Sequence, residues 1–145
     1  MKGLYEIGIV FRGFVLVSYS FKPIKRKEGS KDINIDLRGA FITAINSFAK
    51  NAFNNLALEY LESNNILFIF KVIEIQASDC LSPEPLILYG LTDKTKKDTD
   101  KFVNKFLQKI EPILVLFKSR YNNKDFSELS QFQPFREEIK EFILV

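Results

Sequence analysis

The sequence predicts a single α/β (α+β) domain in which helices cover both faces of an antiparallel sheet. Three observations support this fold class: two β-branched and aromatic runs open the chain around a turn dipeptide, a helical run follows them, and three further strand-like runs precede two helical segments. The 145 residues suffice for one domain with its own core, and the 46% of hydrophobic residues indicates a globular chain. We therefore expect residues 1–145 to form one domain.

The first two strands are expected at residues 4–11 (LYEIGIVF) and 14–21 (FVLVSYSF). The dipeptide Arg12-Gly13 between them suits a tight turn, so the two runs predict a β-hairpin. Both the odd and the even positions of the first run are largely apolar. A strand without a polar face is typical of a sheet that is covered on both sides.

A charged segment without periodicity follows at residues 22–36 (KPIKRKEGSKDINID), and its proline and glycine predict a loop. It holds the main concentration of positive charge in the chain, namely Lys22, Lys25, Arg26, Lys27 and Lys31. The simpler interpretation is a solvated surface loop. The alternative hypothesis is an electrostatic loop that attracts an acidic partner or the surface of an anionic membrane.

The first helix is expected to begin after Asp36, whose side chain suits the N-cap position. Apolar residues then recur at steps of three and four over about five turns, which predicts that this stripe packs on the sheet. The stripe consists of Leu37, Ala40, Phe41, Ala44, Ile45, Phe48, Ala49, Ala52 and Phe53. Ile42 falls beside the stripe, so it is a candidate for contact with a partner.

Three more strands are expected to form a meander. Residues 56–63 (LALEYLES), the turn pair Asn64-Asn65 and residues 66–76 (ILFIFKVIEIQ) predict a second hairpin. Residues 86–92 (LILYGLT) predict a fifth strand that is buried by its composition. Gly90 inside this strand indicates either a bulge or the close approach of a helix.

Two helical segments complete the chain. An apolar set between Phe102 and Phe117 predicts a helix that Pro112 is expected to kink or break. Because the second half of that helix is apolar almost all round, another element must cover it. The helical segment at residues 126–145, with a helix after Pro134, can do so. The predicted order is therefore β-β-α-β-β-β-α-α around a five-stranded antiparallel sheet.

The composition excludes most catalytic chemistry. The sequence has no histidine and one cysteine, Cys80, so Ser-His and Cys-His dyads and zinc sites built from these ligands are ruled out. It has no glycine motif of the nucleotide-binding kind, and no spacing of carboxylates predicts a metal site. We therefore expect neither enzymatic activity nor a cofactor, and Cys80 is interpreted as an unreactive loop residue.

Charge and hydropathy also limit the partners. A net charge of +3 is too small to predict a nucleic-acid interface. No apolar run approaches the roughly 20 residues of a membrane-spanning helix, and no N-terminal signal segment is recognisable. The lone cysteine favours a reducing compartment, so we expect a cytoplasmic protein.

Four segments carry a resemblance to a known family. They are MKGLYEIGIVFRGFVLVSYSF at the start, RGAFITAINSFAKNAF at residues 38–53, LILYGLTDK at residues 86–94 and FQPFREEIKEFI at residues 132–143. These segments and the order of the elements resemble the longin domain, in particular archaeal longin-like proteins. The resemblance covers nearly the whole chain and rests on apolar patterns. It implies a module that dimerises with itself or with another longin or roadblock module, and that binds or regulates a small GTPase in a trafficking or signalling complex.

In paired longin modules the first helix and a strand of the middle hairpin often form the dimer face. The resemblance therefore implies a partner-binding face made of Ile42, Asn46, Lys50, Leu56, Leu58 and Tyr60. The apolar character of residues 56–63 agrees with an edge strand that needs a partner. The alternative is a profilin-like or PAS-like sensor that holds a small ligand between sheet and helix, in a pocket lined by phenylalanines. An enzyme that uses only carboxylates and lysines has no spacing in its favour.

Overall fold

The computed structural model describes residues 3–23, 35–52, 59–63, 65–94 and 98–144. The elements along the chain are β1 (Leu4–Phe11), β2 (Phe14–Ser20), α1 (Ile35–Ala52), β3 (Tyr60–Ser63), β4 (Ile66–Ile75), β5 (Glu84–Asp93), α2 (Thr99–Tyr121), the short 3-10 helix η1 (Leu129–Phe132) and α3 (Phe135–Leu144). This order confirms the predicted fold class, with η1 as an addition between the last two helices.

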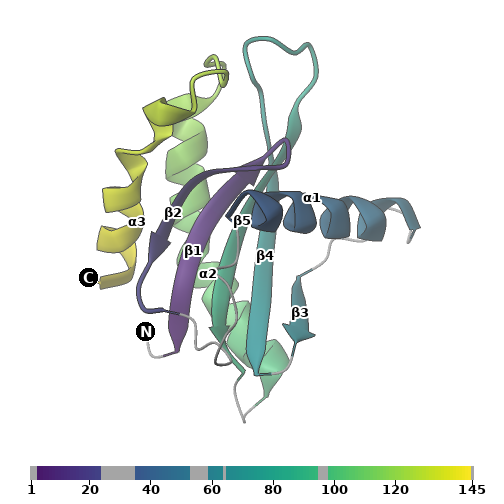
Figure 1. Ribbon diagram of the computed structural model, residues 1–145, viewed down its shortest axis with the longest axis vertical. Coiled ribbons are helices and arrows are strands. Elements are labelled where there is room, and N and C mark those ends of the chain that lie inside the picture. The colour runs from purple at the N-terminus through teal and green to yellow at the C-terminus, as the bar shows by residue number, and fades with distance from the viewer. Residues whose placement is uncertain (1–2, 24–34, 53–58, 64, 95–97, 145) are drawn as a thin grey trace.

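The strands form one antiparallel sheet in the order β2-β1-β5-β4-β3 (Figure 1). The first hairpin joins the later meander where β1 pairs with β5, and Ile7 lies opposite Gly90 there. Every residue of β1 is buried, and β5 is buried from Leu86 to Thr92. The prediction that these strands are covered on both faces is therefore confirmed.

Helices α2 and α3 cover one face of the sheet (Figure 1). An ideal Cβ placed on Gly90 would lie 2.5 Å from Cζ of Phe106, so this glycine lets α2 approach the sheet closely. The ring of Phe117 in α2 lies 5.6 Å from the ring of Phe132 and 5.1 Å from that of Phe135. The C-terminal segment therefore covers the second half of α2 at Phe117, as the sequence predicts, whereas Val115 in the same half stays exposed.

Pro112 does not end α2, which continues as one helix to Tyr121. The expected break is absent because the turns on both sides of the proline are anchored: Ile110, Ile113 and Leu114 are fully buried. Apolar burial on one face therefore outweighs the backbone hydrogen bond that the proline removes.

Helix α1 lies on the opposite face and runs across the strands rather than along them (Figure 1). Among the described elements it contacts mainly β2 and β1. A second, smaller apolar cluster occupies this face, formed by Tyr5, Val10, Ile42, Phe70, Ile87, Tyr89 and Leu91. Because α1 crosses the sheet, the side chains at the border of this cluster, Val15, Leu61, Phe68 and Val72, are only partly buried.

Two of the boundaries that differ from the prediction concern the predicted partner-binding segments. Helix α1 begins at Ile35, so Asp36 lies inside the helix and is not its N-cap. Strand β3 begins at Tyr60, and residues 56–58, where the strand was expected to start, lie outside the described residues.

Candidate protein-interaction surface

Helix α1 packs on the sheet with a different face from the predicted one. Ile42, expected beside the core stripe, is fully buried, and Gly39 and Ala49 are buried on the same side of the helix. The members of the predicted stripe that are exposed are Ala40, Phe41, Ala44, Phe48 and Ala52. The prediction that this stripe forms core is therefore wrong. Of the other members, Ala49 is buried and Ile45 is half-buried, while the side chain of Leu37 and the whole of Phe53 lie outside what the structure describes.

The reason for this orientation is a close contact at Gly39. An ideal Cβ at Gly39 would lie 2.7 Å from the carbonyl oxygen of Gly13 and 3.0 Å from the amide nitrogen of Val15. Any larger residue would push α1 away from the hairpin turn between β1 and β2. The turn that receives α1 has positive φ angles at both Arg12 (51°) and Gly13 (82°), as a tight hairpin turn requires.

A buried polar network fixes the start of α1. Nη1 of Arg38 donates to Oε2 of Glu6 in β1, and the hydroxyl of Tyr89 in β5 donates to the same oxygen. The side chains of Arg38 and Glu6 are each only 11% exposed. Burial, followed by the charge of Glu6, raises the pKa of Tyr89, so the phenol remains a donor. Burial is the largest single influence on the pKa of Arg38 and lowers it, but the hydrogen bond to Glu6 together with the charge of Glu6 and the interaction with Tyr89 raises this pKa overall.

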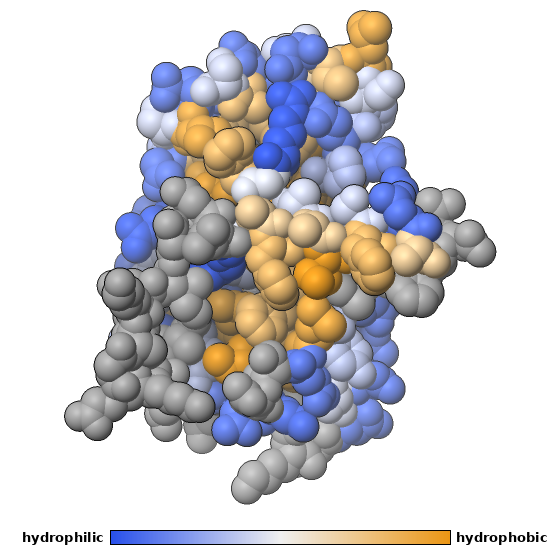
Figure 2. Space-filling model, turned by 45° about the vertical axis from the view of Figure 1, so that its right-hand side comes forward, coloured by the Kyte–Doolittle hydropathy of each residue, from blue (hydrophilic) through white to orange (hydrophobic). Residues whose placement is uncertain are grey.

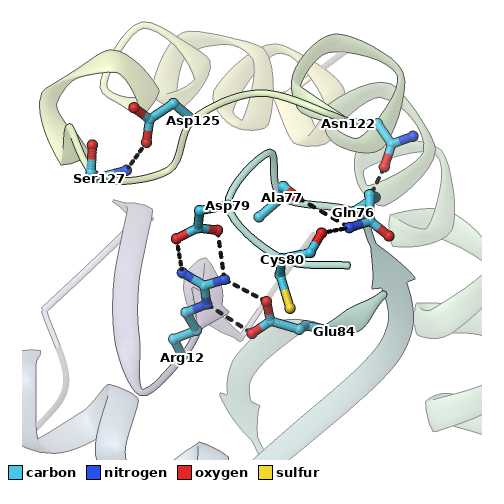
Figure 3. Close-up of polar contacts among 9 residues, drawn as sticks. All are labelled: Arg12, Gln76, Ala77, Asp79, Cys80, Glu84, Asn122, Asp125 and Ser127. Atoms are coloured by element: carbon cyan, nitrogen blue, oxygen red, sulfur yellow. Dashed lines mark hydrogen bonds and ion pairs between the residues drawn. The ribbon is translucent and has the colours of Figure 1, made fainter. Parts of the chain in front are cut away.

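The hairpin turn under Gly39 is itself held by an ionic cluster (Figure 3). Nε of Arg12 donates to Glu84 at 2.7 Å, and the two other guanidinium nitrogens donate to Asp79 at 3.0 and 2.9 Å. Both carboxylates belong to the loop and strand start after β4. The same loop is joined to the end of α2, because the side-chain oxygen of Asn122 accepts from the amide of Gln76 at 2.8 Å.

This cluster predicts a pH dependence of stability. The Arg12 guanidinium holds the pKa of Asp79 and of Glu84 below their ordinary values of 3.8 and 4.5. Carboxyls with lowered folded pKa values contribute stability above the unfolded values, and that contribution is lost as the pH falls through the folded values. We therefore expect Arg12→Gln to lower the free energy of unfolding near neutral pH, and to lower it less in strongly acidic solution. Urea denaturation of the natural protein and of Arg12→Gln, from neutral to strongly acidic pH, measures the difference in the free energy of unfolding. A difference that does not change with pH would contradict the prediction.

The exposed side of α1 forms an apolar surface without charge. We define the α1 apolar surface as Ala40, Phe41, Ala44, Phe48 and Ala52. Phe41 is 47% exposed and Phe48 is 65% exposed. Residues 39–49 (GAFITAINSFA) contain no charged side chain, although 27% of the whole chain is charged. Figure 2 shows apolar side chains along α1 that continue onto the strands below it, where the ring of Phe68 lies 6.3 Å from that of Phe41.

The predicted partner-binding residues do not form one face. Ile42 is buried under α1, and Asn46 is half-buried with its amide nitrogen donating to the Ile42 carbonyl oxygen at 2.9 Å. Lys50 is exposed. The hydroxyl of Tyr60 donates to Asp100 of α2 at 2.8 Å, and Tyr60 packs against the core on the α2 face of the sheet. Leu56 and Leu58 lie outside the described residues.

Only Lys22 of the predicted electrostatic loop can be placed. Its Nζ lies 3.4 Å from a carboxylate oxygen of Asp93 and 4.5 Å from the centre of the Tyr5 ring. Lys22 thus contacts residues of the inner strands β5 and β1. Lys25, Arg26, Lys27 and Lys31 lie outside the described residues.

Phenylalanines that could have lined a sensor pocket are packed in the core, with Phe70, Phe106, Phe117, Phe132 and Phe135 almost completely buried. The described residues contain no group of three or more side chains that could hold a metal ion. None of the helices, as far as they are described, is long and apolar enough to cross a membrane.

No protein-family model matches the sequence, and no curated protein matches it either.

Proposed function

We propose that this chain is a non-enzymatic interaction module of the longin type, which forms a dimer with a second copy of itself and binds a small GTPase as part of that assembly. The observation that carries the proposal is the α1 apolar surface, an exposed helix face with two large aromatic side chains and no charge. The lone cysteine is consistent with action in a reducing compartment such as the cytoplasm.

Exposure of this kind favours a protein partner. Single apolar residues at a surface need no explanation, but here two phenylalanines and three alanines share one face of a single helix. Interface cores are depleted in charge and enriched in aromatic side chains, which matches residues 39–49. Covering the exposed parts of Phe41 and Phe48 would contribute about 1 kcal/mol for each ring.

A second copy fits this surface better than an unrelated protein. In a two-fold symmetric contact the same patch meets itself, so any charge near the axis would face an identical charge. The α1 apolar surface avoids this repulsion because it has none. Ala40 and Ala44 leave a shallow strip along an 18-residue helix of roughly 27 Å, into which Phe41 and Phe48 of the other copy can pack.

The GTPase part of the proposal is supported by the longin resemblance. The structure adds an argument about how such a module would act. Arg12, Arg38 and Arg120 are in ion pairs with carboxylates, and Arg136 lies over the ring of Tyr19 at 5.2 Å. Because each of the arginines in the described part of the chain is engaged in the fold, we propose a binding platform rather than a donor of a catalytic arginine.

The first test is the mass of the protein in solution by light scattering. We expect a dimer for the natural sequence and a monomer for the double variant Phe41→Glu with Phe48→Glu, because two carboxylates per copy would meet across the axis. The matched control is Leu81→Glu with Leu129→Glu, which adds the same charge at exposed leucines outside α1 and should leave the dimer intact.

A natural protein that stays monomeric at high concentration would contradict the self-pairing. If the protein instead paired with another longin or roadblock module through α1, the predicted partner would be wrong, but the predicted binding surface would be correct. GTPase binding is tested separately, by mixing the protein with small GTPases of the same organism in both nucleotide states. A dimer that binds none of them would contradict that part alone.

A further inference from the structure

The outward side of α2 has an unusual arrangement of charge and apolar residues. We define the α2 outer line as the exposed or half-exposed residues that follow one another along the side of α2 away from the sheet: Lys101, Lys105, Lys109, Pro112, Val115 and Leu116. The first three are basic and the last three are apolar. This line lies on the opposite side of the sheet from α1, so it is distinct from the surface of the proposed function (Figure 1).

The basic half of the line is not neutralised by the fold. Elsewhere in the described residues, Arg12, Lys22, Arg38, Lys94 and Arg120 each have a carboxylate within ion-pair distance. The described part of the structure shows no such partner for the three lysines of the line. Asp98 and Asp100 lie near Lys101, but Asp98 accepts from the Lys101 amide and Asp100 accepts from Tyr60. Lys105 and Lys109 are therefore exposed cations, four positions apart on α2, without a carboxylate partner in the described structure.

The apolar half of the line is left uncovered by the C-terminal segment. That segment packs against Phe117 on the inner side of α2, whereas Val115 is 60% exposed and Leu116 is half-buried. Gln108, Glu111 and Ser119 surround these two residues and Pro112 in a shallow depression. Glu111 contributes one negative charge at the flank.

We infer that the α2 outer line binds the surface of an anionic lipid bilayer, with α2 lying in the plane of the headgroups. Basic residues beside exposed apolar ones along one side of a helix are the combination that binds such surfaces. A bilayer fits better than an acidic peptide because the cations of the line are lysines. Ammonium groups act as point charges on flexible stems, whereas shape-specific recognition of carboxylates favours arginine. Bound in this way, the module would present α1 towards the solution.

The test is co-sedimentation with vesicles of phosphatidylcholine alone or mixed with phosphatidylserine. We expect binding only to the mixed vesicles, weakened by added salt. Each basic residue near an anionic surface strengthens binding by about fivefold, so Lys105→Glu with Lys109→Glu should weaken it by more than about twentyfold. The control, Lys118→Glu with Lys124→Glu, changes the net charge equally at exposed lysines outside the line and should retain most of the binding.

A neutral variant tests the apolar half. Val115→Ser should weaken binding to the mixed vesicles by about two- to fivefold without changing the charge. Equal losses from the two charge-reversed variants would overturn the inference, because binding would then follow net charge and not the α2 outer line. Binding to polyglutamate but not to the vesicles would also overturn it, in favour of an acidic polypeptide.

Discussion

Replacement of Glu6 by alanine is expected to lower the free energy of unfolding by about 3 to 5 kcal/mol, among the largest effects of any single change in this protein. The carboxylate accepts hydrogen bonds from Arg38 and Tyr89 in a site where the two charged side chains are each only 11% exposed. Its removal leaves the guanidinium without a counter-charge and the phenol without an acceptor. Urea denaturation at neutral pH measures the loss.

The control for this prediction removes both charges. Glu6→Leu combined with Arg38→Met and Tyr89→Phe keeps similar volumes and leaves neither a charge nor the phenol hydroxyl buried without a partner. This variant should cost far less than Glu6→Ala, because apolar side chains replace a buried ion pair at little net cost. A loss below about 1 kcal/mol for Glu6→Ala would contradict the prediction. It would mean that Arg38 reaches water in the folded protein and that the network does not hold α1 in place.

Ile42→Ala is expected to lower the free energy of unfolding by about 2 to 5 kcal/mol, because Ile42 is the fully buried contact of α1 with the second apolar cluster. Phe48→Ala removes a larger side chain that is 65% exposed, and should cost about 1 kcal/mol or less. Denaturation at a protein concentration that favours the monomer compares the two.

For dimerisation we expect the reverse order of effects from Ile42→Ala and Phe48→Ala. At high concentration, Phe48→Ala should weaken the dimer more than Ile42→Ala does, after correction for the unfolded fraction. If Phe48→Ala destabilised the monomer more than Ile42→Ala, helix α1 would pack with the stripe that the sequence predicts. The proposed surface would then be wrong.

Much of the fold was predictable because local signals and burial agree. The turn residues Arg12 and Gly13 lie between two runs of strand-forming residues, and both adopt positive φ angles. The composition of strand β5 predicts that it is buried, and the structure confirms this from Leu86 to Thr92. In the first half of α2 the apolar residues are interrupted by charged ones, so only one side of this half can face the sheet. The pattern then determines both the type of element and its orientation.

The orientation of α1 was not predictable in the same way, although its existence was. Periodicity specifies that a helix has an apolar stripe, but α1 has apolar or small neutral residues on both sides and no charge between Arg38 and Lys50. Hydropathy favours the side with Phe41 and Phe48, which the structure exposes. One local signal was available: Gly39 in the interior of a helix costs stability and indicates a close backbone approach.

The element types, their order, the antiparallel hairpins and the absence of histidine chemistry follow from the sequence alone, since these depend on near neighbours and composition. The buried side of α1 depends on the folded chain, because contacts between distant residues outweigh the helix's own hydropathy. Glu6 and Tyr89 are 83 positions apart, and Arg12 and Asp79 are 67 positions apart. No periodic pattern links such residues, and burial of a charge is favourable only once the folded chain supplies its partner.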